Sequence, residues 1–387
     1  MEVQSPLIET LLNNKDKILK NGKYNKADFE KLIKSLSIAE NERQRILEKI
    51  EEYGTINIKR LSEELQVSDK NISCNIEYLK ELGLLGFIGE NPRFFQDVIE
   101  NSENKGVFPN VNLIKESKLC SGCGLCVSIC PVNAIDYSEG TFEIDDETCI
   151  KCGLCYSGCP RSFFPKVLDN LEENNDPDIK FREEFNYYRN IYTAQTTFPR
   201  IKKVGQDGGV VTTFFKTAFE QEFIEGSFAV TTGEEPLKPL PILVENSEQL
   251  LKTAGAKYTN TPVLRIFHDA KDYNKIAVVG TPCIMKALKK ISFYPLNKPF
   301  YDNIFIKIGV FCMESFDYDK IVEILKNEFQ MTPSDVKKMD IDKGQFIIYN
   351  QNNEIIKVPL KKIKKYGRFG CFFCDDLTAE HADISVG

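Results

Sequence analysis

Two runs of four cysteines with identical spacing constrain this chain more than any other feature. The first run, followed by proline, is Cys120, Cys123, Cys126 and Cys130. The second, also followed by proline, is Cys149, Cys152, Cys155 and Cys159. This spacing lets one loop deliver three thiolates to three corners of a cuboidal iron–sulfur cluster, while the fourth cysteine of each run binds the other cluster.

The repeat predicts a bacterial-type ferredoxin unit over residues 116–162 with two 4Fe–4S clusters. The ligands expected for one cluster are Cys120, Cys123, Cys126 and Cys159, and for the other Cys149, Cys152, Cys155 and Cys130. Gly122, Gly124 and Gly153 let the backbone approach sulfide closely. The alternatives are a pair of zinc knuckles, which use four ligands in looser pairs, or plain buried cysteines. Two neighbouring clusters imply a one-electron relay.

Length and composition narrow the class of protein. A chain of 387 residues is too long for one compact core and suggests two to four domains. A net charge of −7 gives no overall attraction to nucleic acid or anionic lipid, although lysines between 361 and 365 form a local basic patch. Only two histidines, His268 and His381, argue against haem or a His-rich zinc site.

The cellular compartment follows from the cysteines and the chain's apolar runs. No run approaches the roughly 18 apolar residues of a membrane span. The first residues lack the basic-then-apolar order of a signal peptide. We therefore expect a cytoplasmic protein, in which thirteen cysteines favour metal over disulfides.

Residues 1–95 are predicted to form a helical, winged-helix-like domain. One or two helices are expected within 1–37, and another from Ala39 to Tyr53. A helix over IKRLSEELQV is followed by Ser68, a candidate N-cap, and by the helix DKNISCNIEYLKELG. The apolar face of this last helix comprises Ile72, Ile76, Leu79 and Leu82. LLGFIGENPRFF predicts a small β-wing, which completes the winged-helix pattern.

Winged helices often place the second helix of the turn in the major groove of DNA. Here the charges on that helix nearly cancel, so phosphate attraction is weak. Those charges are Asp69, Lys70, Glu77, Lys80 and Glu81. The preferred interpretation is a protein-docking module, with DNA binding and a plain helical bundle as alternatives. Cys74 on this helix is interpreted as a lone thiol.

Two polar segments, 96–115 and 163–199, are predicted to be linkers. From residue 200 to 387, short β-rich runs alternate with helical segments. The predicted strands are SFAVTT, KIAVVG and IFIKIGVF, and the predicted helices VVTTFFKTAFEQEF, TPCIMKALKKI and DYDKIVEILKNEF. Such alternation is typical of an α/β domain. The chain as a whole is predicted to be an α+β multidomain protein.

Four cysteines remain outside the ferredoxin unit and Cys74: Cys283, Cys312, Cys371 and Cys374. Four is the number that one more cluster needs. The first two follow or end predicted strands, at the edge where open α/β sheets bind ligands. A zinc site and unrelated buried cysteines are the alternatives.

GQDGGVVTT, residues 205–213, is rich in glycine and opens a predicted helix. Bare amides in such a loop can hold a phosphate. A second run of this kind is TAGAKYTNTP, residues 253–262. Loops often carry glycines, so these runs alone leave the ligand open.

Several of these segments together resemble a known family, the beta subunits of coenzyme F420-dependent hydrogenases and dehydrogenases. The segments are VGQDGGVVTTFFKTAFE, AGAKYTNTPVL, VVGTPC, IGVFCMESF and CFFCDDLTAEHADISVG. The resemblance covers about the last 185 residues and is specific in combination. A ferredoxin unit also precedes this domain in some relatives, among them an F420-dependent sulfite reductase, whereas a winged helix is not a usual part.

The resemblance implies that the C-terminal domain binds FAD, holds a flavin-proximal 4Fe–4S cluster and exchanges hydride with the deazaflavin coenzyme F420. The candidate cofactor-binding residues are Gly205, Gly208, Gly209, Thr212, Lys257 and Thr281. The family continues beyond HADISVG, which itself resembles the start of a strand, so residues 200–387 are expected to be an incomplete domain.

The expected function is electron transfer between reduced coenzyme F420 and a partner oxidoreductase, through FAD and three 4Fe–4S clusters. Hydride transfer needs no general base, and the sequence indicates none. One alternative is a redox-sensing regulator that binds DNA through residues 40–95. The other is a non-catalytic ferredoxin-like subunit whose C-terminal domain only docks partners.

Overall fold

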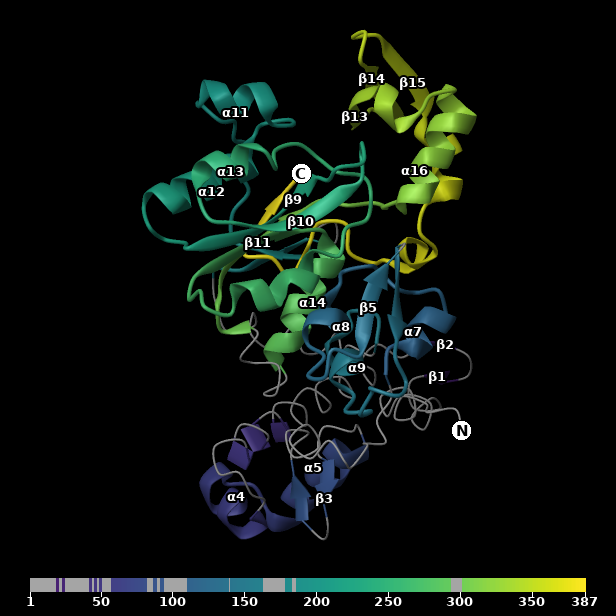
Figure 1. Ribbon diagram of the computed structural model, residues 1–387. Coiled ribbons are helices and arrows are strands. Elements are labelled where there is room, and N and C mark those ends of the chain that lie inside the picture. Colours follow the sequence, from purple (N-terminus) through teal and green to yellow (C-terminus); the bar gives the residue numbers. More distant parts are fainter. Residues whose placement is uncertain are drawn as a thin grey trace.

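A computed structural model describes the chain in several ranges (Figure 1). They are 57–81, 110–138, 140–162, 178–182, 186–293 and 301–387, with short pieces at 19–20, 23–24, 42–43, 45–46, 49–50, 86–88 and 91–93. Predictions that fall elsewhere, such as Leu82 on the apolar helix face, lie outside the described residues.

A five-stranded sheet forms the centre of the C-terminal domain (Figure 1). Its strands, in sheet order, are β10 (Pro239–Val244), β9 (Gly226–Thr232), β11 (Ile276–Gly280), β12 (Ile304–Val310) and β16 (Ile384–Val386). All neighbouring strands are parallel except β10, which pairs antiparallel with β9 at one edge. The three predicted strands and the strand in HADISVG are confirmed.

Residues of β9 and β11 alternate between two cores, as the two-residue period of a strand requires. Phe228 and Val278 belong to one core, whereas their neighbours Ala229 and Ala277 belong to the other. Because both faces are buried, these strands are continuous apolar runs, which is why the sequence revealed them.

Helices cover both faces of the sheet. On one face lie α11 (Pro199–Val204), α12 (Val210–Glu220) and α13 (Ser247–Leu251) (Figure 1). The other face is covered by the 3-10 helix η1 (Val263–Ala270) and by α14 (Pro282–Phe293), beside the ferredoxin unit (Figure 1). The helices predicted near 210 and 282 are confirmed.

A second, antiparallel sheet was not predicted from the sequence. It comprises β13 (Val336–Asp342), β14 (Gln345–Asn350) and β15 (Ile355–Pro359). Its apolar face packs on α16 (Tyr318–Ile324) and the π-helical turn η3 (Leu325–Phe329), the helix predicted from DYDKIVEILKNEF. Short turns complete this part: η4 (Pro333–Asp335), α17 (Leu360–Ile363), η5 (Lys364–Tyr366) and η6 (Phe369–Phe373).

The ferredoxin unit repeats one local structure twice. Its elements are α8 (Leu125–Ser128), β5 (Ile135–Ser138), β6 (Thr141–Ile144) and α9 (Leu154–Gly158). The helix α7 (Asn112–Glu116) precedes them and lies almost wholly in the segment 96–115, where the prediction of a linker is therefore wrong. The helices α8 and α9 each begin after a glycine with positive φ, Gly124 at 84° and Gly153 at 78°. Only glycine adopts this conformation without strain, so each glycine turns the chain from a cysteine loop into a helix.

The ferredoxin unit and the C-terminal domain share one hydrophobic core. Leu125 and Ile129 from the ferredoxin unit are buried in the same cluster as Val263, Leu264 and Ile291. A shared core fixes one unit against the other, unlike two domains on a loose linker.

In the N-terminal region, α4 (Ile58–Leu65) is followed by α5 (Asp69–Glu81), and β3 (Gly86–Ile88) pairs with β4 (Asn91–Arg93) where the wing was expected. The winged-helix arrangement of these elements stays a prediction. The Ser68 hydroxyl accepts from the Asn71 amide at 3.3 Å, as the N-cap prediction requires. Among the residues described here, the buried hydrophobic ones are Ile46, Ile50, Leu61, Leu65, Ile72, Ile76 and Leu79.

The prediction of helix within 1–37 is wrong at the residues described there. β1 (Leu19–Lys20) pairs antiparallel with β2 (Lys23–Tyr24). The two residues between them in the sequence are Asn21 and Gly22, the pair most favoured in two-residue hairpin loops. A further short hairpin, β7 (Lys180–Arg182) with β8 (Asn186–Tyr188), lies in the segment predicted as a linker.

Candidate cluster and cofactor sites

The ferredoxin cysteines gather in two sets. Burial raises the pKa of the Cys126 thiol, and Cys123, Cys159 and Cys120 raise it further, with a smaller contribution from Cys155 of the other set. Burial also raises the pKa of Cys155 to about 12, with contributions from Cys152, Cys130 and Cys149. Each set thus contains the fourth cysteine of the other run. This supports the crossed ligand assignment, which stays a prediction.

Backbone amides point at the sulfur atoms. The Gly122 amide donates to Cys120 Sγ at 3.4 Å, and the Ala134 amide donates to Cys130 Sγ at 3.2 Å. Such bonds favour the thiolate, the form that binds metal. At Cys120 the amide hydrogen bond opposes burial, which raises the pKa of this thiol.

The four remaining cysteines also come together. Burial raises the pKa of the Cys312 thiol, and Cys283, Cys371 and Cys374 raise it further. Cys283 and Cys312 follow β11 and β12, so the predicted location at the carboxyl ends of strands is confirmed. We call Cys283, Cys312, Cys371 and Cys374 the last cysteine set.

Within the described ranges, no three side chains of His, Cys, Asp or Glu are placed to hold a single metal ion. This includes the eight ferredoxin cysteines as well as the last cysteine set. The cluster assignment therefore rests on the cysteine spacing in the sequence, and for the last cysteine set it stays a prediction.

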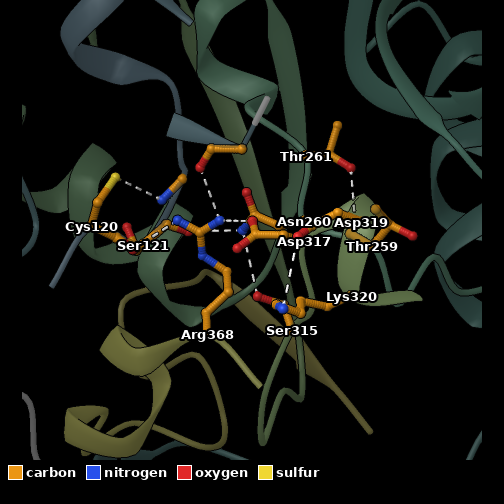
Figure 2. A network of polar contacts seen from close by, with 12 residues as sticks. Cys120, Ser121, Thr259, Asn260, Thr261, Ser315, Asp317, Asp319, Lys320 and Arg368 are labelled. Atoms are coloured by element: carbon orange, nitrogen blue, oxygen red, sulfur yellow. Dashed lines mark hydrogen bonds and ion pairs between the residues drawn. The ribbon is translucent and has the colours of Figure 1, made fainter. Parts of the chain in front are cut away.

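The first ferredoxin set lies beside the last cysteine set. Burial raises the pKa of the Cys123 thiol, and Cys159 and Cys283 are among the groups that raise it further. The Leu264 amide in η1 donates to the Cys123 carbonyl at 2.9 Å. Asn260 donates from Nδ2 to the Ser121 carbonyl at 2.8 Å (Figure 2). The C-terminal domain therefore holds the first cysteine loop directly.

Arg368 forms the centre of a second group of contacts at this interface. Figure 2 shows its guanidinium between the Cys120–Ser121 segment and Asp317. It donates to the Cys120 and Gly140 carbonyls, both at 3.0 Å, and forms an ion pair with Asp317. Because Gly140 lies in the turn between β5 and β6, Arg368 ties two parts of the ferredoxin unit to the C-terminal domain.

Two further cations lie close to the first set. Lys290 of α14 is 1% exposed and donates to the Cys159 carbonyl at 2.7 Å and to the Ser162 hydroxyl. Burial lowers the pKa of Lys290 to about 7. Arg161 donates from Nη1 to the Phe373 carbonyl at 3.2 Å. Sequence reasoning missed Arg161, Lys290, Asn260 and Arg368, because no local pattern distinguishes them.

The two glycine runs predicted to bind a cofactor lie next to each other. Gln206 accepts from the Ala256 amide at 3.0 Å and donates to the Tyr258 hydroxyl at 3.2 Å and to Asp340 at 2.8 Å. Lys257 donates to the carbonyls of residues 253, 254 and 255, between 2.7 and 3.0 Å. Burial lowers the pKa of Lys257 to about 8. The three hydrogen bonds of its ammonium therefore stabilise the backbone conformation of the second run.

The candidate residues of the first run surround the start of α12. Gly209 is the N-cap, with a φ of 63° and no side-chain cap on the helix. The Gly205 and Gly209 amides already donate to Ile201 and Gln206 carbonyls. The amides of the first turn of α12 are the groups that a helix start leaves without an intrahelical partner, and phosphate binding there stays a prediction.

Two candidates have other surroundings. Thr212 is buried within α12. The Thr281 hydroxyl lies 3.2 Å from Cys283 Sγ, so it belongs with the last cysteine set. Thr196, assigned to a linker from the sequence, packs on the glycine run, where its amide donates to the Gly208 carbonyl at 2.8 Å. A single buried threonine in a polar segment has no sequence pattern that would reveal its burial, so Thr196 was not predicted.

Comparison with known families accounts for most of the chain. Residues 191–268 and 273–387 match the N-terminal and C-terminal parts of the coenzyme F420 hydrogenase/dehydrogenase beta subunit, and residues 119–163 match a 4Fe–4S dicluster domain. A coenzyme F420 hydrogenase subunit beta of Methanosarcina barkeri is 33% identical, over 52% of this chain and 70% of that protein. The chain belongs to the coenzyme F420 hydrogenase/dehydrogenase beta-subunit family. The resemblance noted in the sequence is thus confirmed.

Further similar proteins extend the comparison. An uncharacterized protein of Methanocaldococcus jannaschii is 34% identical over 70% of this chain and 80% of its own length. A coenzyme F420-dependent sulfite reductase of the same organism is 35% identical over 72% of this chain and 43% of that enzyme. A chain of the F420-reducing [NiFe] hydrogenase complex from Methanosarcina barkeri aligns with a TM-score of 0.48 at 33% identity, covering 49% of this chain and 67% of that one.

Family membership and the dicluster match make the protein an iron–sulfur electron-transfer protein of an oxidoreductase family. In the part of the chain that the structure describes, no helix has both the length and the apolar character needed to cross a membrane.

Proposed function

We propose that this protein transfers electrons between reduced coenzyme F420 and a partner oxidoreductase, with FAD and three 4Fe–4S clusters as its cofactors. The observation that carries the proposal is the position of the last cysteine set beside the first ferredoxin set, where Arg161 donates to the Phe373 carbonyl and Arg368 to the Cys120 carbonyl. Relatives that bear the names of F420 hydrogenase and F420H2 dehydrogenase subunits support the substrate and the existence of partner subunits. The proposed compartment is the cytoplasm.

The proposed sites assign the chain's residues to three tasks. The twelve cysteines of the ferredoxin unit and the last cysteine set hold the clusters. The start of α12, with Gly205, Gly208 and Gly209, holds a phosphate of the flavin, and Lys257 supports the adjoining turn. Bound FAD would supply the conversion between a two-electron hydride and single electrons.

Anaerobic reconstitution tests the proposal. The full chain is expected to bind about twelve irons with matching sulfide, four for each cluster, and one flavin. The bound flavin is expected to bleach when reduced coenzyme F420 is added. A protein with full iron content that binds no flavin would instead support the non-catalytic ferredoxin-like subunit.

Removing residues 1–95 is expected to leave iron and flavin content unchanged. No cysteine proposed as a ligand and no candidate flavin residue lies in that segment. The measurement is iron, sulfide and flavin per chain before and after the deletion. Loss of clusters from the shortened chain would contradict the modular organisation.

The redox-sensing regulator has one specific observation in its favour, the helix–turn–helix of α4 and α5 with the β3–β4 hairpin. The residues of α5 carry nearly balanced charge, which gives little attraction to phosphate. We therefore expect the full chain to bind duplex DNA no better than a neutral protein in a gel shift at physiological salt. Sequence-specific retardation would favour the regulator.

A further inference from the structure

Two arginines cross the interface between the ferredoxin unit and the C-terminal domain in opposite directions. Arg161, which follows Cys159 and a proline, donates to the carbonyl of Phe373 at 3.2 Å. Phe373 directly precedes Cys374 of the last cysteine set. Arg368 of the C-terminal domain donates to the carbonyl of Cys120, the first ligand of the ferredoxin unit, at 3.0 Å. Each guanidinium thus extends from one cysteine set to the backbone beside the other.

Both arginines keep one buried donor without an acceptor. Among the described residues, the buried side-chain nitrogens with no hydrogen-bond partner are Arg161 Nε and Arg368 Nε. An unsatisfied buried donor is costly and rare in a native protein. Cluster sulfide and cysteine sulfur are acceptors that would lie at this interface. Hydrogen bonds to these sulfur atoms help to set the reduction potential of an iron–sulfur cluster.

The positive charges of the arginines lie near both cysteine sets. Arg161 follows Cys159 of the first ferredoxin set by two positions and donates to the residue before Cys374. Arg368 precedes Cys371 by three positions and donates to the Cys120 carbonyl. Two cations therefore lie where the two cysteine sets approach each other.

We propose that Arg161 and Arg368 are a reciprocal pair of positioning residues that fix the first ferredoxin site against the last cysteine set and stabilise the reduced form of the clusters there. The inference rests on the proposed function. Uptake of one electron from reduced coenzyme F420, or from dithionite in a titration, adds one negative charge to a cluster and breaks no bond. A neighbouring cation with a free N–H donor lowers the free energy of that added charge.

Paired substitutions separate charge from position. Arg161→Gln and Arg368→Gln remove the charge, whereas Arg161→Lys and Arg368→Lys keep it but lose the forked donor geometry. Arg368→Gln leaves Asp317 without its partner, so the double variant Arg368→Gln with Asp317→Asn is included. The matched control is Arg200→Gln, because Arg200 is exposed and paired with Glu248 away from any cysteine.

Two measurements on the reconstituted full chain test the proposal. The first is a dithionite titration followed by electron paramagnetic resonance. The glutamine variants are expected to shift cluster reduction to more negative potential, while the lysine variants and Arg200→Gln stay near the wild type. The second is hydrogen exchange over residues 119–123 and 137–141. All Arg368 variants are expected to exchange there about tenfold faster or more, as lost hydrogen bonds imply.

The outcomes distinguish this inference from the proposed function. Potentials and exchange that match the wild type in all arginine variants would overturn the inference, even with three clusters bound. A wild-type chain that binds only about eight irons would overturn the third cluster of the proposed function. In that case a potential shift of the remaining clusters in the glutamine variants still supports the role of Arg161 and Arg368.

Discussion

Replacing Cys371 and Cys374 together by serine is expected to remove about four of roughly twelve irons from the reconstituted chain. Two of the four proposed ligands of one cluster are then missing. A serine hydroxyl is not ionised near neutral pH, so it does not replace a thiolate ligand. The ferredoxin cysteines are untouched, so about eight irons should remain, with the electron paramagnetic resonance of their two reduced clusters.

The control for this experiment is Cys74→Ser. Cys74 is exposed on α5 and belongs to none of the three cysteine sets, so its loss should leave the iron content unchanged. The measurement is iron and sulfide per chain after anaerobic reconstitution of each variant. A double variant that retains all of its iron would show that the last cysteine set holds no cluster.

The sequence allowed those parts of the fold to be predicted whose signature is local. The strands β9, β11 and β12 are apolar runs because both faces of the sheet are buried. The cysteine spacing fixes the ferredoxin unit, because three ligands of each cluster come from one loop. Ser68 was found since an N-cap contacts residues only three positions away.

The sheet of β13, β14 and β15 was missed for a physical reason. Its first hairpin turns at Lys343 and Gly344, both with positive φ, of 47° and 73°. That is the geometry of a two-residue type I′ loop, in which asparagine or aspartate is usual at the first position and lysine is not. The turn was therefore not recognisable, and the strands beside it carry exposed lysines that blur their alternation.

The polar contacts of the candidate site could not be predicted from the sequence either. Arg368 and Cys120 are 248 positions apart, and Asn260 and Ser121 are 139 apart. A single sequence carries no information about such pairs, because neither partner belongs to a local motif. By contrast, the gathering of the last cysteine set was predictable from their number and from their positions after strands.

Replacing Gly209 by valine is expected to abolish flavin binding while both ferredoxin clusters stay visible by electron paramagnetic resonance. Gly209 has a φ of 63°, and a Cβ there would lie 3.0 Å from Ile201 Cγ2 and 3.1 Å from Thr196 Cγ2. The left-handed conformation alone costs a side chain about 1–2 kcal/mol, and a β-branched one more. Relief of that strain moves the start of α12, where the first-turn amides are proposed to hold a phosphate.

The matched control is Gly344→Ala, which has the same kind of backbone but no atom within 4 Å of the added Cβ. It should lower the free energy of unfolding by about 1–2 kcal/mol and leave flavin binding intact. Gly209→Asn is the second comparison, because asparagine tolerates positive φ better than valine. Flavin per chain, circular dichroism and thermal melting are measured for each variant. If Gly209→Val folds and binds flavin like the wild type, the glycine run is a structural turn and the phosphate of the flavin is held elsewhere.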